Sequence, residues 1–547
     1  PPLPLLAERI GGEADLAALR LVADRLREAT GVGSAVGRLG TATFGILLFP
    51  ETPDADGART AATEVQHHLD EALCVRGTRI TGQWRLGLGG PPQAEERERI
   101  TADALVERAE MAMAESVPGR AADALTVYAP TMESAVTRRR QLEADLRGGV
   151  DPEQLRLMLQ PQLDLQSGRV IGAEALVRWQ HPTHGWISPA QFIPLAEETG
   201  AILDIGQWVL HEGCRTLAAW QRQGLDPIRI GINVSPRQLH ECALVQRVRE
   251  AIERFNIDPA CLELEVTESM LLGEEETVLA TLHELKGLGV RLAIDDFGTG
   301  YSSLAYLRRY PMDTLKVDRA FVRDLQHRTE DRLIVSSVVA LARGLNMEII
   351  AEGVEDEAQR AILASDGCDV FQGFLVARPG SYSDLAGLTV SRNRPGAPDL
   401  DPVSADNSDA TGQRMPSPLP WRDSMRLGLD PVDKDHKALV ETINELLENM
   451  AAGADTASLR AGLRAVLEHT RTHFQREETI MQNIGYPRLE AHRAKHEALL
   501  DEFEAFLAQD GLDQGGTAVA ANYVKYWFAH HLMNDDRKLI TYLEEGR

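Results

Sequence analysis

The sequence predicts an α/β multidomain protein with an N-terminal α+β region, a central (β/α)8-type barrel and a C-terminal four-helix bundle. Three observations predict this fold class. The chain has 547 residues, which is too long for one hydrophobic core and suggests about three domains. Short apolar strands alternate with helical periods through the middle of the chain. Beyond a polar segment near its end, only helical periods follow.

Composition indicates globular folding and narrows the class of partner. Apolar residues make up 43% of the chain and charged residues 26%, as in globular domains. We find no transmembrane run and no signal peptide, so we expect no membrane insertion. The net charge of −26 argues against binding to duplex nucleic acid. Five scattered cysteines without metal-binding spacing predict free thiols in a reducing cytoplasm.

Residues 1–131 form the first predicted region, which combines helices with a short strand. Its expected elements are the helix Ala14–Thr30, the strand Phe44–Phe49 and the helices Ala61–Cys74 and Ile100–Met113. A polar helix at residues 132–147 is expected to connect this region to the barrel.

Residues 148–389 contain repeated β–α units. The predicted strands are Val170–Trp179, Arg229–Val234, Leu262–Thr267, Arg291–Asp296, Thr314–Asp318, Glu348–Glu352 and Val370–Gly373. Helical periodicity fills the gaps, for example at Leu203–Gln223 and Arg332–Leu345. Units of this size favour a parallel sheet that closes as a (β/α)8-type barrel.

The C-terminal part begins with a predicted flexible linker at residues 390–420, which is rich in Pro, Ser, Asp, Asn and Gly. Within residues 421–547, four helical stretches follow: Asp433–Met450, Ala457–Met481, Leu489–Ala508 and Ala518–Leu543. Four helices with short connections suggest an up-down bundle.

Polar residues, mostly acids, follow the apolar part of six predicted strands. They are Glu174, Asn233, Glu265, Asp295 with Asp296, Lys316 and Glu352. A single acid at a strand end is more often a helix cap or loop residue. Six equivalent positions in succession argue against that interpretation, because the ends of parallel barrel strands meet at one face, where such enzymes build their sites.

Converging carboxylates would repel one another and lose hydration unless cations lay between them. Oxygen-rich clusters suit Mg²⁺ or Mn²⁺, and two such ions about 4 Å apart can clamp the attacking and leaving oxygens of a phosphodiester. The consecutive acids Asp295 and Asp296 suit a bridge between two ions. Lys316 could hold the water or a non-bridging phosphate oxygen.

The motifs around these residues resemble the EAL family of cyclic di-GMP phosphodiesterases. They are Gln160-Pro161-Gln162, Glu174-Ala175-Leu176, Val177-Arg178-Trp179, Asn233-Val234-Ser235, Glu265-Val266-Thr267-Glu268, Asp295-Asp296-Phe297-Gly298-Thr299-Gly300, Lys316-Val317-Asp318, Glu352-Gly353-Val354-Glu355 and Gln372-Gly373-Phe374. The resemblance implies hydrolysis of cyclic di-GMP to linear pGpG with two Mg²⁺ or Mn²⁺ ions.

The same resemblance implies a role for each site residue. The first metal would be held by Glu174, Asn233, Glu265 and Asp295, and the second by Asp295, Asp296 and Glu352. Lys316 and Gln372 would orient the attacking water, with Glu352 as a candidate base, and the dinucleotide contacts would be Gln160, Arg178 and Asp318. Glu268 would brace the loop Phe297–Ser303, which the family uses for metal binding and dimer contacts, so a homodimer through the EAL domain is expected.

In the first region, the segment Arg38–Phe44 resembles the Arg-Leu-Gly-Gly-Asp-Glu-Phe hairpin of diguanylate cyclases, the GGDEF family. Ala102–Leu105 and Arg108–Met113 resemble a later helix of that family. However, the family's Gly, Asp and Glu are replaced by Thr41, Ala42 and Thr43, so no acid remains to hold Mg²⁺. The family's first strand, with its metal-binding Asp, is also missing. We predict a degenerate, truncated domain without cyclase activity, which either regulates or dimerises the protein or is a decaying scaffold.

The predicted bundle is rich in histidines. The pairs His473–Glu477 and His492–His496 have i,i+4 spacing and share a helix face. A lone histidine on an apolar face usually belongs to the core or surface, and even two such pairs can be accidental. Imidazoles and two carboxylates projected from four helices nevertheless suggest a di-iron site.

Four segments of the bundle together resemble bacterial hemerythrins: Asp433–Lys437, His473–Glu478, His492–His496 and Trp527–Asp536. The resemblance implies that one iron is bound by His492, His496 and His531, and the other by His436 and His473, with an open position for O₂. Glu477 and Asp536 would bridge the irons, whereas His469 and His530 would not be ligands. The bundle would then sense oxygen, redox state, nitric oxide or iron.

Three functions remain open at this point. The first is a cyclic di-GMP phosphodiesterase regulated by a di-iron module, and the intact set of acids favours it. The second is a cyclic di-GMP receptor without turnover, and the third is an oxygen or iron carrier with a passenger barrel. The residues do not indicate which iron state would activate hydrolysis.

Overall fold

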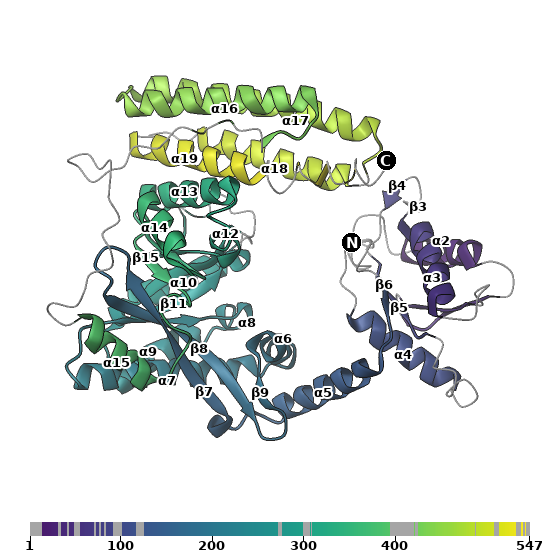
Figure 1. Cartoon of the computed structure of the whole chain (residues 1–547), viewed down its shortest axis with the longest axis horizontal. Helices are drawn as coiled ribbons and strands as arrows, with labels where there is room; N and C mark the ends of the chain where they lie inside the picture. The colour runs from purple at the N-terminus through teal and green to yellow at the C-terminus, as the bar shows by residue number, and fades with distance from the viewer. Residues whose placement is uncertain are drawn as a thin grey trace. The chain divides into compact units, whose positions relative to one another are not determined.

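The computed structural model describes residues 14–30, 34–40, 43–48, 55–70, 73–75, 78–80, 84–90, 101–115, 125–271, 276–298, 307, 309–393, 419, 421, 425–486, 488–507, 514–531, 536, 538–539 and 542. The chain divides into two compact units, Pro1–Ala144 and Asp145–Arg547, each of which has its own internal packing (Figure 1). Among the helices within these ranges, none is long and apolar enough to cross a membrane.

The first unit consists of helices and short strands. They are α2 (Ala14–Thr30), β1 (Ala35–Arg38), β2 (Phe44–Leu47), α3 (Ala55–Asp70), β3 (Leu73–Val75), β4 (Thr78–Ile80), β5 (Leu86–Leu88), α4 (Ala102–Glu115), β6 (Leu125–Val127) and α5 (Pro130–Arg147), which ends in the second unit. Helices α2 and α3 bury Val22, Leu26, Val65 and Leu69 against one another. The predicted helix at Ala14–Thr30 is confirmed.

Several predicted boundaries in this unit were wrong. The helix expected at Ala61–Cys74 begins at Ala55 and ends at Asp70, because Leu73–Val75 pairs with β4 as an antiparallel strand. The strand expected at Phe44–Phe49 ends at Leu47, and the connecting helix begins at Pro130. Strands β1 and β2 form the antiparallel hairpin expected around Arg38–Phe44, of which Thr41 and Ala42 lie outside the described residues.

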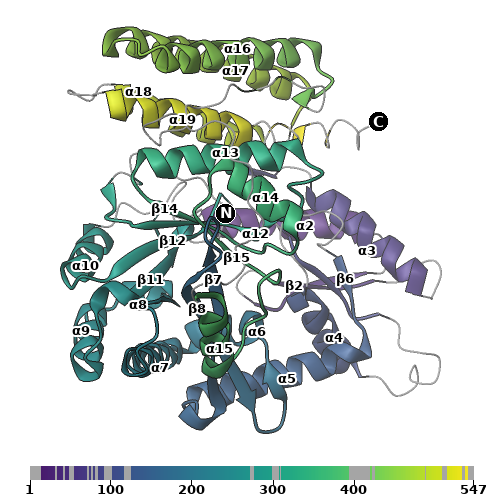
Figure 2. The ribbon, with the colours of Figure 1, turned by 60° about the vertical axis from the view of Figure 1, so that its left-hand side comes forward.

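The second unit contains a closed barrel. Its strands and principal helices are β7 (Leu155–Asp164), β8 (Val170–His181), β9 (Gly185–Ile187), α6 (Pro189–Thr199), α7 (Ile202–Arg222), β10 (Arg229–Asn233), α8 (Pro236–Leu239), α9 (Leu244–Phe255), β11 (Leu262–Thr267), α10 (Glu276–Gly287), β12 (Arg291–Phe297), β13 (Thr314–Val317), α12 (Arg319–Val322), α13 (Thr329–Gly344), β14 (Glu348–Ala351), α14 (Glu357–Asp366), β15 (Val370–Gln372) and α15 (Tyr382–Asn393). Helices surround the strands (Figure 2), so the strands are buried on both faces and read as apolar runs.

The barrel is parallel except for one strand that the sequence prediction missed. Strand β8 pairs in parallel with β10, and the parallel order continues through β11, β12, β13, β14 and β15. Strand β7 closes the barrel by pairing antiparallel with both β15 and β8. Residues 165–169 are too few for the crossover that a parallel β7–β8 connection would need, so these strands form a hairpin.

Helix α15 corrects the start of the predicted linker. Residues 390–393 belong to this helix, and the rest of the expected linker lies mostly outside the described residues. The side chain of Asn393 explains the extension, because its amide oxygen accepts from Val170 N at 3.0 Å and its amide nitrogen donates to Val170 O at 3.0 Å. The helix end is thereby attached to the start of β8.

The four predicted bundle helices are present: α16 (Asp430–Ala451), α17 (Thr456–Asn483), α18 (Leu489–Leu507) and α19 (Gln514–His531). Helix α16 packs on α17 and α19, and α17 packs on α18 and α19. The described part of the last helix ends at His531, whereas the prediction continued it to Leu543. The buried polar residues described in the bundle include five histidines and the two acids Glu477 and Asp536.

Candidate metal centres and active site

The polar strand ends of the barrel do converge. Carboxylate oxygens of Glu174, Glu265 and Asp295 lie within 4.8 Å of one another, as do those of Asp295, Asp296 and Glu352. Strand pairing produces this convergence, since Gly231 on β10 lies in register with Glu174 on β8. Gly231 also makes room for a ligand, because a Cβ there would lie 2.0 Å from Glu265 Oε1.

The two consecutive acids of β12 need a special backbone to face the same place. Side chains of neighbouring strand residues normally point to opposite faces. Asp296 has a left-handed backbone with φ of 54°, and the pairing of β12 with β13 shifts register between Ile294 and Phe297. A non-glycine residue held at positive φ is strained and is often found at functional sites. Here the distortion brings the carboxylates of Asp295 and Asp296 into one cluster.

Lys316 lies at the centre of the acid cluster and is fully buried. Its Nζ lies 2.6 Å from Glu265 Oε2, 2.7 Å from Glu352 Oε1, 3.0 Å from Asp295 Oδ1 and 3.8 Å from Glu174 Oε2. Burial alone would lower the pKa of Lys316, but the surrounding carboxylates raise it well above its usual value. The lysine therefore keeps its charge and compensates part of the negative charge around it.

One lysine does not neutralise all the acids. Burial, reinforced by Asp295, raises the pKa of Glu352 to about 8, although Lys316 opposes the shift. Burial and Asp295 also raise the pKa of Asp296 to about 6. Groups of this kind would ionise more readily beside divalent cations, and their all-oxygen donor set fits Mg²⁺ or Mn²⁺. Asn233 completes the set, with its Nδ2 donating to Glu174 Oε1 at 2.8 Å.

Glutamine side chains fix the orientation of Glu174. Gln372 Nε2 lies 2.5 Å from Glu174 Oε2 and 3.2 Å from Gln160 Oε1. Gln162 Nε2 donates to Gln372 Oε1 at 3.0 Å. Sequence reasoning gave no role to Gln162, although its alternation with Gln160 on β7 was a visible signal. These contacts place Gln372 and Gln160 directly beside the predicted metal ligands.

The other predicted contacts of the dinucleotide lie at the same end of the barrel. Arg178 on β8 is half-buried, and burial lowers its pKa while Glu174 raises it. Asp318 follows β13 and caps α12 by accepting from Ala320 N at 2.7 Å. Its carboxyl also interacts with Asp296.

Glu268 supports the end of β12 as predicted. Its Oε2 accepts a hydrogen bond from Gly298 N at 2.8 Å, next to the Asp295–Phe297 segment. Gly298 has φ of +100°, a conformation that favours glycine. The remainder of the predicted loop, from residue 299 to Ser303, lies outside the described residues.

The bundle brings the predicted iron ligands together in two overlapping groups. Ligand atoms of one group lie within 4.8 Å of one another, and its members are Glu477, His492, His496 and His531. The second group has the same spacing and consists of His473, Glu477, His531 and Asp536. His436 is adjacent, with its Nε2 3.0 Å from Asp536 Oδ2 and 3.3 Å from His473 Nε2. Glu477 and His531 belong to both groups, whereas Asp536 belongs only to the second.

The chemistry of these side chains fits iron. Glu477 Oε1 and the Nε2 atoms of His492 and His496 are buried without a hydrogen-bond partner. Burial, reinforced by His436, lowers the pKa of His473 to about 3, so its imidazole stays neutral and can bind a metal. Mixed imidazole and carboxylate sets of this kind suit iron. His469, which was predicted not to be a ligand, is exposed and forms a hydrogen bond with Thr442. The side chain of His530, the other predicted non-ligand, lies outside the part of the chain that the structure describes.

Two supporting residues in the bundle were missed by sequence reasoning. Glu478 Oε1 lies 2.9 Å from His496 Nδ1, which leaves Nε2 as the ligand nitrogen. The ring of Phe474 stacks on His496 with centroids 3.5 Å apart. Both residues stand within the His473–Glu478 segment, but only the packing of α17 on α18 shows which ligand they support.

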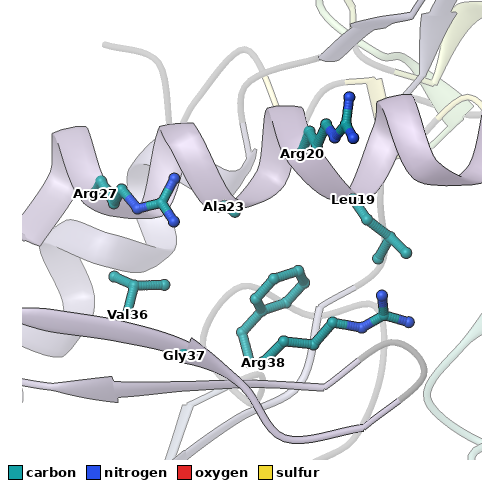
Figure 3. Close-up of a pocket in the computed structure, with 8 residues that line it drawn as sticks. Leu19, Arg20, Ala23, Arg27, Val36, Gly37 and Arg38 are labelled. Carbon is teal, nitrogen blue, oxygen red and sulfur yellow. The ribbon is translucent and has the colours of Figure 1, made fainter.

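In the first unit, the β1–β2 hairpin and α2 enclose a pocket that includes Arg20, Arg27 and Arg38 (Figure 3). Two of these arginines already have local partners. Arg27 pairs with Asp24 at 2.8 Å, and Arg38 Nε donates to Gly40 O at 2.8 Å. The pocket wall contains no acid that could hold Mg²⁺ among its described residues.

Comparison with known proteins identifies two segments. Residues 143–379 match the family described as EAL domain, and residues 427–543 match the family described as hemerythrin HHE cation binding domain. The bifunctional diguanylate cyclase/cyclic di-GMP phosphodiesterase MucR of Pseudomonas aeruginosa is 39% identical over 361 residues, which cover 65% of this chain and 51% of MucR. The cyclic di-GMP phosphodiesterase NbdA of the same organism is 35% identical over 373 residues, 68% of this chain and 47% of NbdA.

Among solved structures, one described as the PaMucR phosphodiesterase in complex with c-di-GMP is 48% identical. The match covers 45% of this chain and 99% of that chain, with a TM-score of 0.44. The chain thus spans about half the length of the two curated relatives named above.

Proposed function

We propose that this chain hydrolyses cyclic di-GMP to linear pGpG under the control of its hemerythrin domain. Residues 143–379 belong to the EAL family, and residues 427–543 belong to the hemerythrin family. The observation that carries the proposal is the cluster of five carboxylates around the buried amine of Lys316. The names of the relatives support the same substrate. Free cysteines, such as the buried Cys214 and Cys368, support a cytoplasmic setting.

The two ions would share Asp295 and otherwise have different ligands. One ion would be held by Glu174, Asn233, Glu265 and Asp295, and the other by Asp295, Asp296 and Glu352. When bound, two Mg²⁺ or Mn²⁺ ions supply Lewis-acid stabilisation of the phosphate and a more acidic water.

The remaining side chains would position the reactants. Lys316, held by its carboxylate neighbours, presents a fixed positive charge to the attacking water or to a phosphate oxygen. Glu352, 2.7 Å from Lys316 Nζ, is placed to accept the proton of that water at its carboxylate. Gln372 keeps Glu174 oriented, and the half-buried Arg178 offers a cation for the dinucleotide phosphates. Gln160 and Asp318 would complete the substrate contacts.

In the bundle, His492, His496 and His531 would hold one iron, and His436 and His473 the other, with Glu477 and Asp536 between them. This asymmetric set leaves a position for O₂ or another small ligand. The bundle would therefore report oxygen, redox state or iron to the barrel. We also propose a homodimer through the EAL domain, and no cyclase activity, because Thr43 and its neighbours replace the catalytic acids.

The test is incubation of the purified chain with cyclic di-GMP and Mn²⁺ or Mg²⁺, with pGpG measured by chromatography. Formation of pGpG that changes with iron loading is expected. Tight binding without pGpG would instead identify a receptor. Hydrolysis that does not respond to iron would leave the bundle as an oxygen- or iron-binding module without control of the barrel. Incubation with GTP and Mg²⁺ should give no cyclic di-GMP.

A further inference from the structure

We propose that helix α19 couples the two sites directly, through contact of Tyr526 with Phe297 at the end of the metal-binding strand β12. The inference rests on the proposed function of both sites and adds the route between them. The route runs through packed side chains of the second unit.

Helix α19 is buried on every side, which is unusual for an outer helix of a bundle. Every residue from 520 to 528 is buried, including Lys525 and Asn522. A bundle helix normally keeps one solvated face. Helices α16 and α17 cover one side of α19, and α13 of the barrel covers another, as both views show (Figures 1 and 2). Helix α19 is therefore shared between the bundle and the barrel.

On the barrel side, Tyr526 reaches the acid site. Its ring lies 5.7 Å from that of Phe297, centroid to centroid, with the planes tilted by 31°. Phe297 is fully buried and directly follows Asp295 and Asp296 in the chain. Burial raises the pKa of Tyr526, and the charge of Glu268 raises it further. Tyr526 thus lies beside both the last residue of β12 and the carboxylate that holds Gly298 N.

On the bundle side, residues next to Tyr526 touch the iron ligands. The ring of Trp527 stacks on the ring of His531, with the centroids 5.3 Å apart. The ring centroid of Phe528 lies 5.9 Å from that of His436. Tyr526, Trp527, Phe528 and His531 belong to the one helix α19, whose backbone hydrogen bonds make it move as a rigid element. A displacement of His531 on iron binding or ligand exchange would therefore be carried to Tyr526.

The buried side chain of Lys525 helps to fix the position of α19 on the barrel. Burial lowers the pKa of Lys525 to about 8, while Asp366 at the end of α14 opposes this shift. Asp366 also pairs with Arg332 of α13 at 2.9 Å. Because a buried lysine tolerates few alternative positions, sliding of α19 along α13 is disfavoured and Tyr526 is kept opposite Phe297.

The coupling can be measured without relying on activity. We would follow hydrogen exchange in peptides that contain Phe297 and Gly298, in iron-free and iron-loaded full-length protein, and compare wild type with Tyr526→Ala. Iron should change exchange in the wild type by about five-fold or more, the lower range for coupled sites. Tyr526→Ala should abolish this change while keeping the wild-type iron content and the iron-free rate of cyclic di-GMP hydrolysis.

Two further variants serve as controls. Tyr526→Leu keeps an apolar side chain and should fold if the alanine variant does not, and it should also lose the response. Leu463→Ala weakens the core of α17 without touching the barrel, so it should keep the response for the fraction of protein that binds iron. Light scattering would separate these effects from a change in assembly.

The outcomes distinguish the inference from the proposed function. A response of Tyr526→Ala and Tyr526→Leu equal to that of the wild type would overturn the inference. So would a wild type that hydrolyses cyclic di-GMP and binds iron but shows no change in exchange at Phe297. A wild type without hydrolysis or without iron would overturn the proposed function itself, and the coupling with it.

Discussion

The barrel and the bundle both gather predicted metal ligands, most of them buried, but the charge of the acids is compensated differently in the two sites. In the barrel, the amine of Lys316 lies within 4.0 Å of four carboxylates. In the bundle, the ion pairs that the structure describes for Glu477 and Asp536 are all with histidines. The barrel site therefore contains a permanent cation, whereas the bundle site has only imidazoles, which titrate: burial lowers the pKa of His473 to about 3, and Asp536, against the effect of burial, raises the pKa of His531 to about 10.

This difference indicates how each site depends on metal. A barrel with an internal cation can keep its acids together before metal binds, so Mg²⁺ or Mn²⁺ serves the reaction more than the fold. In the bundle, several buried ligand atoms, such as Nε2 of His496, have no hydrogen-bond partner. Each such atom costs folding free energy unless it binds a metal. Iron should therefore contribute to the stability of the bundle.

The largest effect should come from the predicted metal-binding acids of the barrel. Glu174→Gln removes a charge that contacts Asn233, Gln372 and Lys316 together. We expect hydrolysis to fall on the order of 10²–10³-fold or more, because preorganised charge is lost from the site. The rate of pGpG formation and the thermal unfolding curve would be compared. Gln246→Glu, on the exposed side of α9, is the control and should leave the rate unchanged.

Replacement of Lys316 tests whether this lysine compensates the charge of the buried acids in the barrel. Lys316→Met leaves the buried acids without compensation and should destabilise the metal-free barrel by about 3 kcal/mol or more. Added Mn²⁺ should restore part of this loss. Unfolding in urea, with and without Mn²⁺, measures both. In the control Lys286→Met, the lost pair with Asp313 is partly exposed, so we expect about 1 kcal/mol or less. Equal losses for both variants would contradict the central role of Lys316.

Removal of iron should affect the bundle more than removal of Mg²⁺ affects the barrel. With free iron about 100-fold above its dissociation constant, binding would stabilise the bundle by about 2.7 kcal/mol. An iron chelator should therefore lower the unfolding transition of the bundle, followed by the fluorescence of Trp527 and Trp421. If the barrel lost as much stability on removal of Mg²⁺, its lysine would not compensate the acids as inferred.

The smallest expected effect comes from the residue that orients a histidine. Glu478→Gln replaces the charged acceptor of His496 Nδ1 with a neutral, weaker one and should lower iron affinity by about 10–100-fold, the usual range for such partners. Iron titration of the apo-protein measures the affinity. Glu490→Gln removes an exposed acid of α18 that pairs with Arg493, and it should bind iron as the wild type does. An unchanged affinity for Glu478→Gln would show that packing alone orients His496.

By itself, the sequence was sufficient to predict the barrel, the four helices and the ligands that converge in each. Both patterns are local, since an acid after an apolar strand and a His–Glu pair at i,i+4 each point to a shared end or face. Most of the predicted ligand residues lie together in the structure, although the full ligand sets came from the family resemblances and not from spacing alone.

The tertiary structure alone decided how those residues meet. The left-handed Asp296, the antiparallel closure by β7 and the four contacts of Lys316 all depend on pairings between distant segments. The burial of α19 is the clearest case, because periodicity shows that a face is apolar but not which element covers it. The contact of Tyr526 with Phe297 joins residues that no local sequence pattern relates, so only the tertiary structure shows it.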